Sequence, residues 1–181
     1  MCIRDRVISD QAELKALFER GELDRDCVVV ARFQGPAANG MPELHQLMPI
    51  LGVLQDRGHA VALVTDGRLS GASGKVPAAI HVTPEAAKGG AIGRIQDGDM
   101  ISLDVAAGEL RVAVDEQILA DRPHPDTPMA RNTVGRGLFK FSREVVTDAE
   151  SGGCTLFEPL VMDDLPQRQS ARDIAYEHCA S

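Results

Sequence analysis

Apolar and polar positions in the first third of the chain follow two periods, one typical of helices and one typical of strands. Leu14 and Leu17 share a helical face and Asp10 can cap the N-terminus, so the sequence predicts a helix over 10–20. The run CVVVARF at 27–33 is β-branched and almost continuously apolar. Such a run is typical of a strand that is buried on both faces.

A second helix and a second strand follow. Leucines recur at helical spacing from 44 to 54, and Pro42 suits the first position of a helix. Pro49 interrupts this pattern, so we expect a kink there or two short abutting helices. The apolar run at 60–64 predicts another buried strand. A β–α–β unit of this kind usually pairs its two strands in parallel.

The rest of the chain consists of short apolar segments separated by turn signals. This pattern predicts a β-rich meander that forms a small barrel or sandwich. The expected strands are 78–82, 92–95, 100–105 and 110–114, with a further extended segment at 154–157. The expected helices are 84–88, 115–122, 138–146 and 171–178.

Composition and charge narrow the class of protein. The 181 residues are enough for one domain with its own core. A formal net charge of −8 argues against a nucleic-acid partner. No apolar run approaches the roughly 18 residues of a membrane span, and the start has no apolar signal segment. The four cysteines form no CxxC pair, which argues against a disulfide framework or a zinc site. We therefore expect a cytoplasmic protein.

The segment TDGRLSGASGKVP at 65–77 carries the strongest chemical signal. Its glycines let the backbone approach a ligand closely, and Arg68 and Lys75 are either anion-binding groups or solvated loop charges. Ser70 in such a loop ordinarily makes a turn. A role as nucleophile or base needs a group that lowers its pKa, such as a nearby metal. Asp66 is expected to orient loop amides or Arg68.

Other polar residues have a structural and a functional interpretation. Glu43 follows Pro42 at an expected helix start, where the helix dipole favours a carboxylate, and it is also suited to bind Mg²⁺. His81 alternates with apolar residues in an expected strand, which favours a structural role. The sequence DGD at 97–99 resembles a cation-binding loop, but it lies between expected strands and is interpreted as a turn.

Two stretches together resemble one family. FQGPAANGMPELHQLMPILGVLQDRG at 33–58 and VALVTDGRLSGASGKVPAAIHVTPEAAKGG at 61–90 resemble the C-terminal part of the dihydroxy-acid/phosphogluconate dehydratase family. ANGMPELH and SGASGKVPAAIHVTPEA look like its 6-phosphogluconate branch, and the resemblance covers roughly 7–157. It implies an α/β fold, a mixed swivelling β/β/α-type domain with a β-barrel-like core and flanking helices.

The resemblance also implies a reaction and a set of residues. The family branch is a hydro-lyase that dehydrates 6-phospho-D-gluconate to 2-dehydro-3-deoxy-6-phosphogluconate in the Entner–Doudoroff pathway. An iron–sulfur cluster, expected to be 4Fe-4S, acts as Lewis acid, and Mg²⁺ holds the substrate carboxylate. The family's proton-abstracting serine falls on Ser70 and its metal-binding glutamate on Glu43. Arg68, Ser73 and Lys75 become candidates for substrate phosphate or carboxylate contacts.

The chain departs from the family pattern in what it lacks. The cluster cysteines and the other Mg²⁺ ligands of the family lie in an N-terminal domain that this sequence does not match. We therefore expect a fragment that is inactive alone and belongs to a homodimeric full-length protein. The expected division is a non-native leader at 1–6, the dehydratase domain at 7–157 and a tail at 158–181. The alternatives are a dehydratase of another sugar acid or dihydroxy acid, and a non-catalytic swivel module that binds anions.

Overall fold

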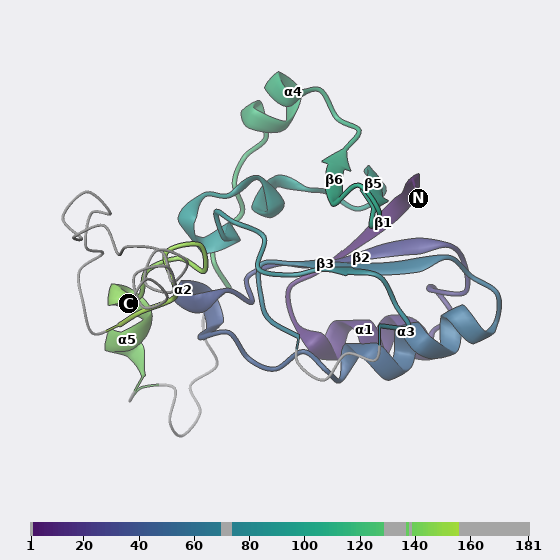
Figure 1. The fold of residues 1–181 in the computed structure, drawn as a ribbon, viewed down its shortest axis with the longest axis horizontal. Coiled ribbons are helices and arrows are strands. Elements are labelled where there is room, and N and C mark those ends of the chain that lie inside the picture. Colours follow the sequence, from purple (N-terminus) through teal and green to yellow (C-terminus); the bar gives the residue numbers. More distant parts are fainter. Residues whose placement is uncertain (1, 70–73, 129–136, 138, 156–181) are drawn as a thin grey trace, which may run out of the picture.

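The computed structural model describes residues 2–69, 74–128, 137 and 139–155, and within these residues six strands form one mixed sheet (Figure 1). The strands are β1 (Cys2–Ile8), β2 (Cys27–Ala31), β3 (Val61–Thr65), β4 (Ala78–Ala79), β5 (Met100–Asp104) and β6 (Glu109–Val112). Their order across the sheet is β4-β3-β2-β1-β5-β6. β1 to β4 run parallel, whereas β5 and β6 form an antiparallel hairpin whose first strand pairs with β1.

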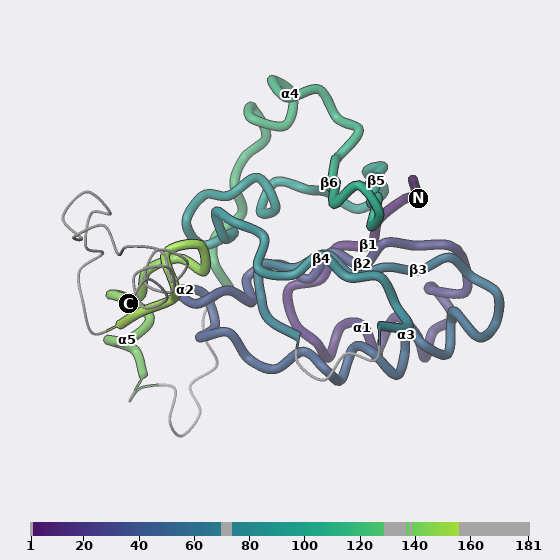
Figure 2. The backbone as a smooth tube through the Cα atoms, in the orientation of Figure 1, coloured from purple at the N-terminus to yellow at the C-terminus, as the bar shows by residue number. Residues whose placement is uncertain are grey.

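Helices flank this sheet. They are α1 (Gln11–Glu19), α2 (Pro36–Asn39), α3 (Leu47–Asp56), α4 (Glu116–Asp121) and α5 (Lys140–Val145), with 3₁₀ turns η1 (Ala86–Lys88) and η2 (Ala91–Arg94). Figure 1 shows α1 and α3 side by side on one face of β1–β3. In Figure 2 the β5–β6 hairpin turns away from the β1–β3 layer, so the sheet is strongly curved. The expected α/β class, with a mixed sheet and flanking helices, is confirmed.

The central strands are buried on both faces, as their apolar runs predict. Val29 and Leu63 pack with α1 and α3 in one core. Val28 and Val30, on the opposite face of β2, belong to a second core with Ile92 of η2. A parallel strand that contacts a core on each side needs apolar residues at successive positions. The predicted parallel pairing of β2 with β3 is also confirmed.

The prediction of a helix that begins at Pro42 and is kinked or divided at Pro49 is wrong on both points. α3 begins at Leu47, and Pro49 lies in its first turn. The first backbone N–H groups of a helix have no intrahelical acceptor, so a proline there removes no hydrogen bond. α1 matches its prediction, and Asp10 caps it by accepting a hydrogen bond from Ala12 N.

The second half contains less strand than the sequence predicts. The expected strand at 92–95 is wrong, because this segment lies in and just after η2, where Ile92 and Ile95 are buried three residues apart. That spacing places both side chains on one face of a 3₁₀ turn. The strand expected at 78–82 is limited to β4, because His81 adopts a left-handed φ of 56°. The expected meander is replaced by one hairpin that extends the first half's sheet.

Four further segments differ from the expected structure or lie beyond the described residues. Residues 2–6, expected in a non-native leader, belong to β1, and the expected GPAANG loop contains α2. Cys154 lies in no strand, and the expected helix at 171–178 lies outside the described residues. The short helices expected at 84–88, 115–122 and 138–146 match η1, α4 and α5.

Candidate functional site

The carboxyl ends of β1, β2 and β3 lie at one edge of the sheet. The segment after β2 carries the GPAANGMPE motif, and the segment after β3 carries the TDGR motif. Loops that follow adjacent parallel strands meet at that edge, which is the usual place of ligand sites in open α/β sheets. The two resemblance motifs are therefore brought together by the parallel pairing of β2 and β3.

Asp66, directly after β3, holds these loops together. Its buried carboxylate accepts hydrogen bonds from Phe33 N at 3.1 Å, Gln34 N at 2.9 Å and Ala86 N at 2.9 Å. Burial raises the pKa of Asp66 above its ordinary value, while the backbone amides act in the opposite direction. Because all three partners are donors, the ionised carboxylate is the form that fits them. The prediction that Asp66 orients loop amides is confirmed.

Glu85 holds the start of the GPAANG motif from a distant part of the chain. Its buried carboxylate accepts hydrogen bonds from Ala37 N at 3.0 Å and Ala38 N at 3.2 Å, at the first turn of α2. A Cβ added at Gly35 would lie 2.8 Å from Glu85 Cδ, which explains the glycine. Burial raises the pKa of Glu85, and the Ala37 and Ala38 amides oppose that shift. Sequence reasoning missed Glu85 because its partners lie 48 and 47 positions away.

Glu43 and Arg68, both predicted site residues, are neighbours. Their backbones form an isolated parallel bridge, and Arg68 Nη1 lies 3.5 Å from Glu43 Oε2. Arg68 Nε also donates to the Met41 carbonyl at 2.8 Å. The Glu43 side chain is 23% exposed and that of Arg68 is 47% exposed, so a ligand can reach both groups. The structure thus joins a carboxylate and a guanidinium at the mouth of the glycine-rich loop.

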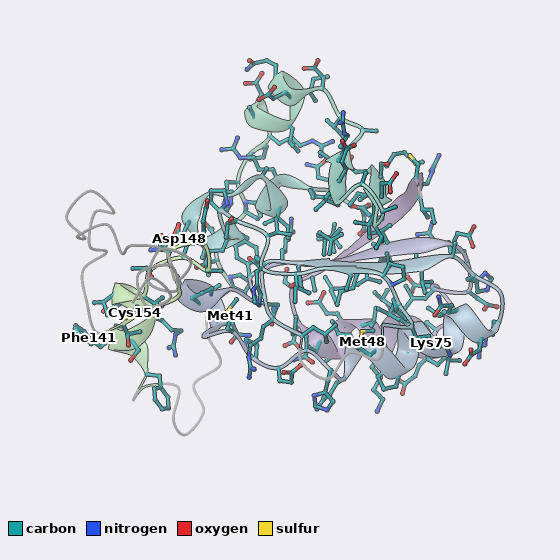
Figure 3. The ribbon with its side chains drawn as sticks, viewed as in Figure 1. Met41, Met48, Lys75, Phe141, Asp148 and Cys154 are labelled. Carbon is teal, nitrogen blue, oxygen red and sulfur yellow. The ribbon has the colours of Figure 1, made fainter. Side chains whose placement is uncertain are left out.

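The other predicted site residues are placed differently. Lys75 Nζ forms an ion pair with Asp56 of α3. Figure 3 shows Lys75 beside α3, well away from Met41. The structure therefore does not bring Lys75 to the Glu43–Arg68 pair. Ser70 and Ser73 lie outside the described residues.

Left-handed backbone at non-glycine residues marks this edge of the sheet. Within the described residues it occurs at Phe33, with a φ of 60°, at Met41, with 53°, and at His81, with 56°. Such conformations cost free energy and concentrate at ligand sites. The strand pattern around His81 favours a structural role and does not predict this left-handed backbone.

A cavity of about 710 Å³ lies next to the α2 loop and is lined by Met41, two residues before Glu43. The α2 loop contributes Asn39 and Met41, the segment after β4 contributes His81, and α5 contributes Ser142 and Arg143. Met41 joins the cavity to the pair, because its carbonyl accepts the hydrogen bond from Arg68 Nε. Volumes of this size are typical of small-molecule sites.

The described residues offer few ligands for a metal centre. No group of three or more His, Cys, Asp or Glu side chains able to hold a metal ion occurs among them. Cys2 is exposed, Cys27 is buried and Cys154 is partly buried. Glu43 is a hard oxygen donor of the kind that Mg²⁺ prefers.

The DGD segment at 97–99 is a structural turn, as the sequence predicts. Asp97 accepts a hydrogen bond from Val7 N at 2.6 Å, and Asp99 pairs with Arg122 through both carboxylate oxygens, at 2.5 and 2.9 Å. These contacts tie the triplet to β1 and to the segment after α4. In a separate finding, none of the helices in the described part of the chain has the length and apolar character needed to cross a membrane.

Comparisons with known proteins agree on one family. The model of the family described as dihydroxy-acid/6-phosphogluconate dehydratase C-terminal matches residues 3–153. The chain is 58% identical over 156 residues to a phosphogluconate dehydratase of Pseudomonas aeruginosa, covering 86% of this chain and 26% of the relative. It is 53% identical over 152 residues to a phosphogluconate dehydratase of Zymomonas mobilis, covering 84% and 25%.

A more distant relative bears the other name of the family. The chain is 39% identical over 158 residues to a dihydroxy-acid dehydratase of Pelobacter propionicus, covering 83% of this chain and 27% of that protein. The chain thus spans about a quarter of the length of the curated relatives that it matches.

Proposed function

Because the chain belongs to the dihydroxy-acid/6-phosphogluconate dehydratase family, as its C-terminal part, we propose that it is one half of the active site of a 6-phosphogluconate dehydratase. The reaction removes water from 6-phospho-D-gluconate and gives 2-dehydro-3-deoxy-6-phosphogluconate, a step of the Entner–Doudoroff pathway. The observation that carries the proposal is the pairing of Glu43 with Arg68 at the loop that continues to Ser70. The names of the relatives at 58% and 53% identity support the substrate.

In the proposed reaction Ser70 is the base and Arg68 stabilises negative charge. Ser70 takes the proton from C2 of the sugar acid, the C3 hydroxyl departs, and the resulting enol takes a proton at C3 to give the 2-keto acid. Overall one water is lost. Arg68, held by the Met41 carbonyl and the Glu43 carboxylate, presents a fixed positive charge to an anionic substrate. Such pre-organised charge stabilises the negative charge that develops after C2 loses its proton.

Glu43 fits the role of one Mg²⁺ ligand. It is a partly exposed carboxylate at the ligand-binding edge of the sheet, and carboxylates suit Mg²⁺. A bound Mg²⁺ would supply positive charge to the substrate carboxylate and to the enolate form of the intermediate. In the structure the cation beside Glu43 is the Arg68 guanidinium, so Mg²⁺ at Glu43 would share that carboxylate with Arg68.

The described residues do not fit an iron–sulfur cluster. Such a cluster is held by several thiolates, and no three-ligand group of suitable residues occurs among the described residues. We therefore assign no cluster ligand to them and derive no step through a cluster. On this proposal the chain is inactive by itself and acts within a longer, homodimeric protein.

An exchange of segments tests the proposal. Residues 3–153 replace the matching segment of the Pseudomonas aeruginosa relative, and dehydration of 6-phosphogluconate is measured by formation of the 2-keto acid. We expect the chimera to be active and its Glu43→Gln variant to lose most activity with a raised Mg²⁺ requirement. Glu109→Gln, which changes an exposed carboxylate on β6, is the matched control and should keep the parent rate.

The same assay separates the alternatives. A chimera that prefers a non-phosphorylated sugar acid or a dihydroxy acid would show a dehydratase with another substrate. A chimera that folds with its metal centre loaded, yet dehydrates none of these acids, would contradict the catalytic assignment and favour a binding module. Turnover by the unaccompanied 181-residue chain would contradict the inactivity that we propose for it.

A further inference from the structure

We propose that the cavity between α2, His81 and α5 is a phosphate subsite, in which Arg143 and His81 hold the phosphate monoester of the sugar-acid substrate. The inference rests on the proposed function for the identity of the whole substrate. The phosphate-binding property itself belongs to the cavity and can be tested apart from catalysis.

The charge of the cavity wall differs from that of the chain. The chain carries 27 acidic against 19 basic residues, yet the described residues that line the cavity include no Asp or Glu. They do include the cationic Arg143, together with His81, Asn39, Ser142 and Thr155 as further polar groups. The arginine fork matches the oxygens of a phosphate and gives its strongest hydrogen bonds to such anions. Most of the described lining is apolar, and the arginine with these hydrogen-bonding groups gives the wall one place where an anionic group can be held.

Met41 connects the cavity to the proposed reacting end. Met41 lines it, and the carbonyl of the same residue accepts the hydrogen bond from Arg68 Nε at 2.8 Å. The cavity thus adjoins the proposed reacting end, where Glu43 pairs with Arg68. A sugar acid with a carboxylate at one end and a phosphate at the other has the shape to occupy both places.

His81 is fixed in this wall by its backbone. Its N–H donates to the Gly67 carbonyl at 3.0 Å, and its φ of 56° is the left-handed conformation that costs free energy outside glycine. A strained residue that is tied to the catalytic loop and lines a cavity is characteristic of ligand sites. His81 is therefore assigned to the subsite, and not to the structural strand role that its sequence pattern favours.

The subsite also changes the assignment of Lys75. The family resemblance makes Lys75 a candidate for a substrate phosphate or carboxylate contact, but its ammonium group pairs with Asp56 on α3. Arg143, on α5, lies on the wall of the cavity. The geometry thus moves the phosphate contact from the glycine-rich loop to α5.

Binding to the complete 181-residue chain tests the subsite directly. Affinities for 6-phosphogluconate, gluconate and inorganic phosphate are measured by calorimetry for the parent, Arg143→Met and His81→Gln chains. We expect Arg143→Met to weaken 6-phosphogluconate and phosphate binding at least tenfold, and His81→Gln to weaken both several-fold. Gluconate binding should change less than twofold. Arg111→Met, which removes an exposed arginine on β6, should leave all three affinities unchanged.

Two results would overturn the subsite. One is 6-phosphogluconate binding that is the same in Arg143→Met as in Arg111→Met, and the other is an equal loss for gluconate, which would place a carboxylate in the cavity. Urea midpoints of the variants within experimental error of the parent show that the fold is kept. An Arg143-dependent phosphate affinity in a chain whose chimera does not dehydrate 6-phosphogluconate would uphold the subsite and refute the proposed function separately.

Discussion

Substitution of Asp66 by asparagine tests whether one buried carboxylate organises the candidate site. In the native chain Asp66 accepts three backbone hydrogen bonds, from Phe33, Gln34 and Ala86. Asparagine has one acceptor oxygen, so its amide group must face at least one of these N–H donors. Hydrogen bonds to a charged group contribute about 1.5–3 kcal/mol each, and a buried donor without a partner costs about 1–3 kcal/mol.

The net loss follows from these terms. In the Asp66→Asn variant the new side chain would keep two weaker, neutral hydrogen bonds and leave one N–H donor without an acceptor. This loss is partly offset, because the cost of burying the charged carboxylate, which raises the pKa of Asp66, is removed. The free energy of unfolding should fall by about 2–4 kcal/mol. With a urea m-value of about 2 kcal/mol/M, the midpoint should fall by about 1–2 M.

A matched variant shows whether the loss comes from the buried network. Asp26 accepts one backbone hydrogen bond, from Ala60 N at 2.9 Å, and its side chain is 59% exposed. Asp26→Asn should lower the free energy of unfolding by less than about 1 kcal/mol, because water replaces the lost contact. Free energies of unfolding of the two variants that agree within about 0.5 kcal/mol would contradict the role given to Asp66.

Two further predictions concern the packing of α3 and the buried end of the sheet. Leu51 is fully buried in the first core, whereas Val53 of the same helix is 42% exposed. Measured by urea denaturation, Leu51→Ala should lower the free energy of unfolding by about 2–5 kcal/mol and Val53→Ala by less than about 1 kcal/mol. Equal losses would contradict the core assignment. Burial raises the pKa of Asp5 from 3.8 to about 7, so the native state binds this proton more tightly than the unfolded chain, and stability should fall as the pH rises from about 4 to about 7. In Asp5→Asn the side-chain oxygen can still accept the hydrogen bond from Gly98 N, but the group no longer ionises. The decrease of unfolding free energy between about pH 4 and pH 7 should therefore be smaller than in the parent by up to about 4 kcal/mol. A plot of urea midpoint against pH that is identical to the parent's would contradict the prediction.

The sequence predicts what depends on local pattern. β2 and β3 were predicted because both strands are apolar at successive positions, and the cap of α1 was predicted because Asp10 precedes an amphipathic segment. The position of Asp66 at a strand end predicts that it orients loop amides or Arg68, and its hydrogen bonds to Phe33 N and Gln34 N show that it holds the amides.

What the sequence does not predict depends on contacts between distant segments. α2 is held by Glu85 from another loop. Pro36 and Gly40, which bound this single turn, are equally typical of a loop, so the segment alone does not predict a helix. The segment of the 3₁₀ turn η2 is short and apolar, as a strand would be. What distinguishes it is that Ile92 and Ile95, three residues apart, both pack in the second core. The role of His81 depends on a backbone conformation that a strand-like pattern conceals.

The central claim is that the loop after β3 supplies the proton-abstracting base of a sugar-acid dehydratase. The most direct test is the rate of 6-phosphogluconate dehydration by the chimera with Ser70→Ala, compared with Ser102→Ala in β5. Removal of a general base typically costs about 10²–10⁴-fold in rate. We expect such a loss for Ser70→Ala and the parent rate for Ser102→Ala. A Ser70→Ala chimera that keeps the parent rate would show that Ser70 is not the base.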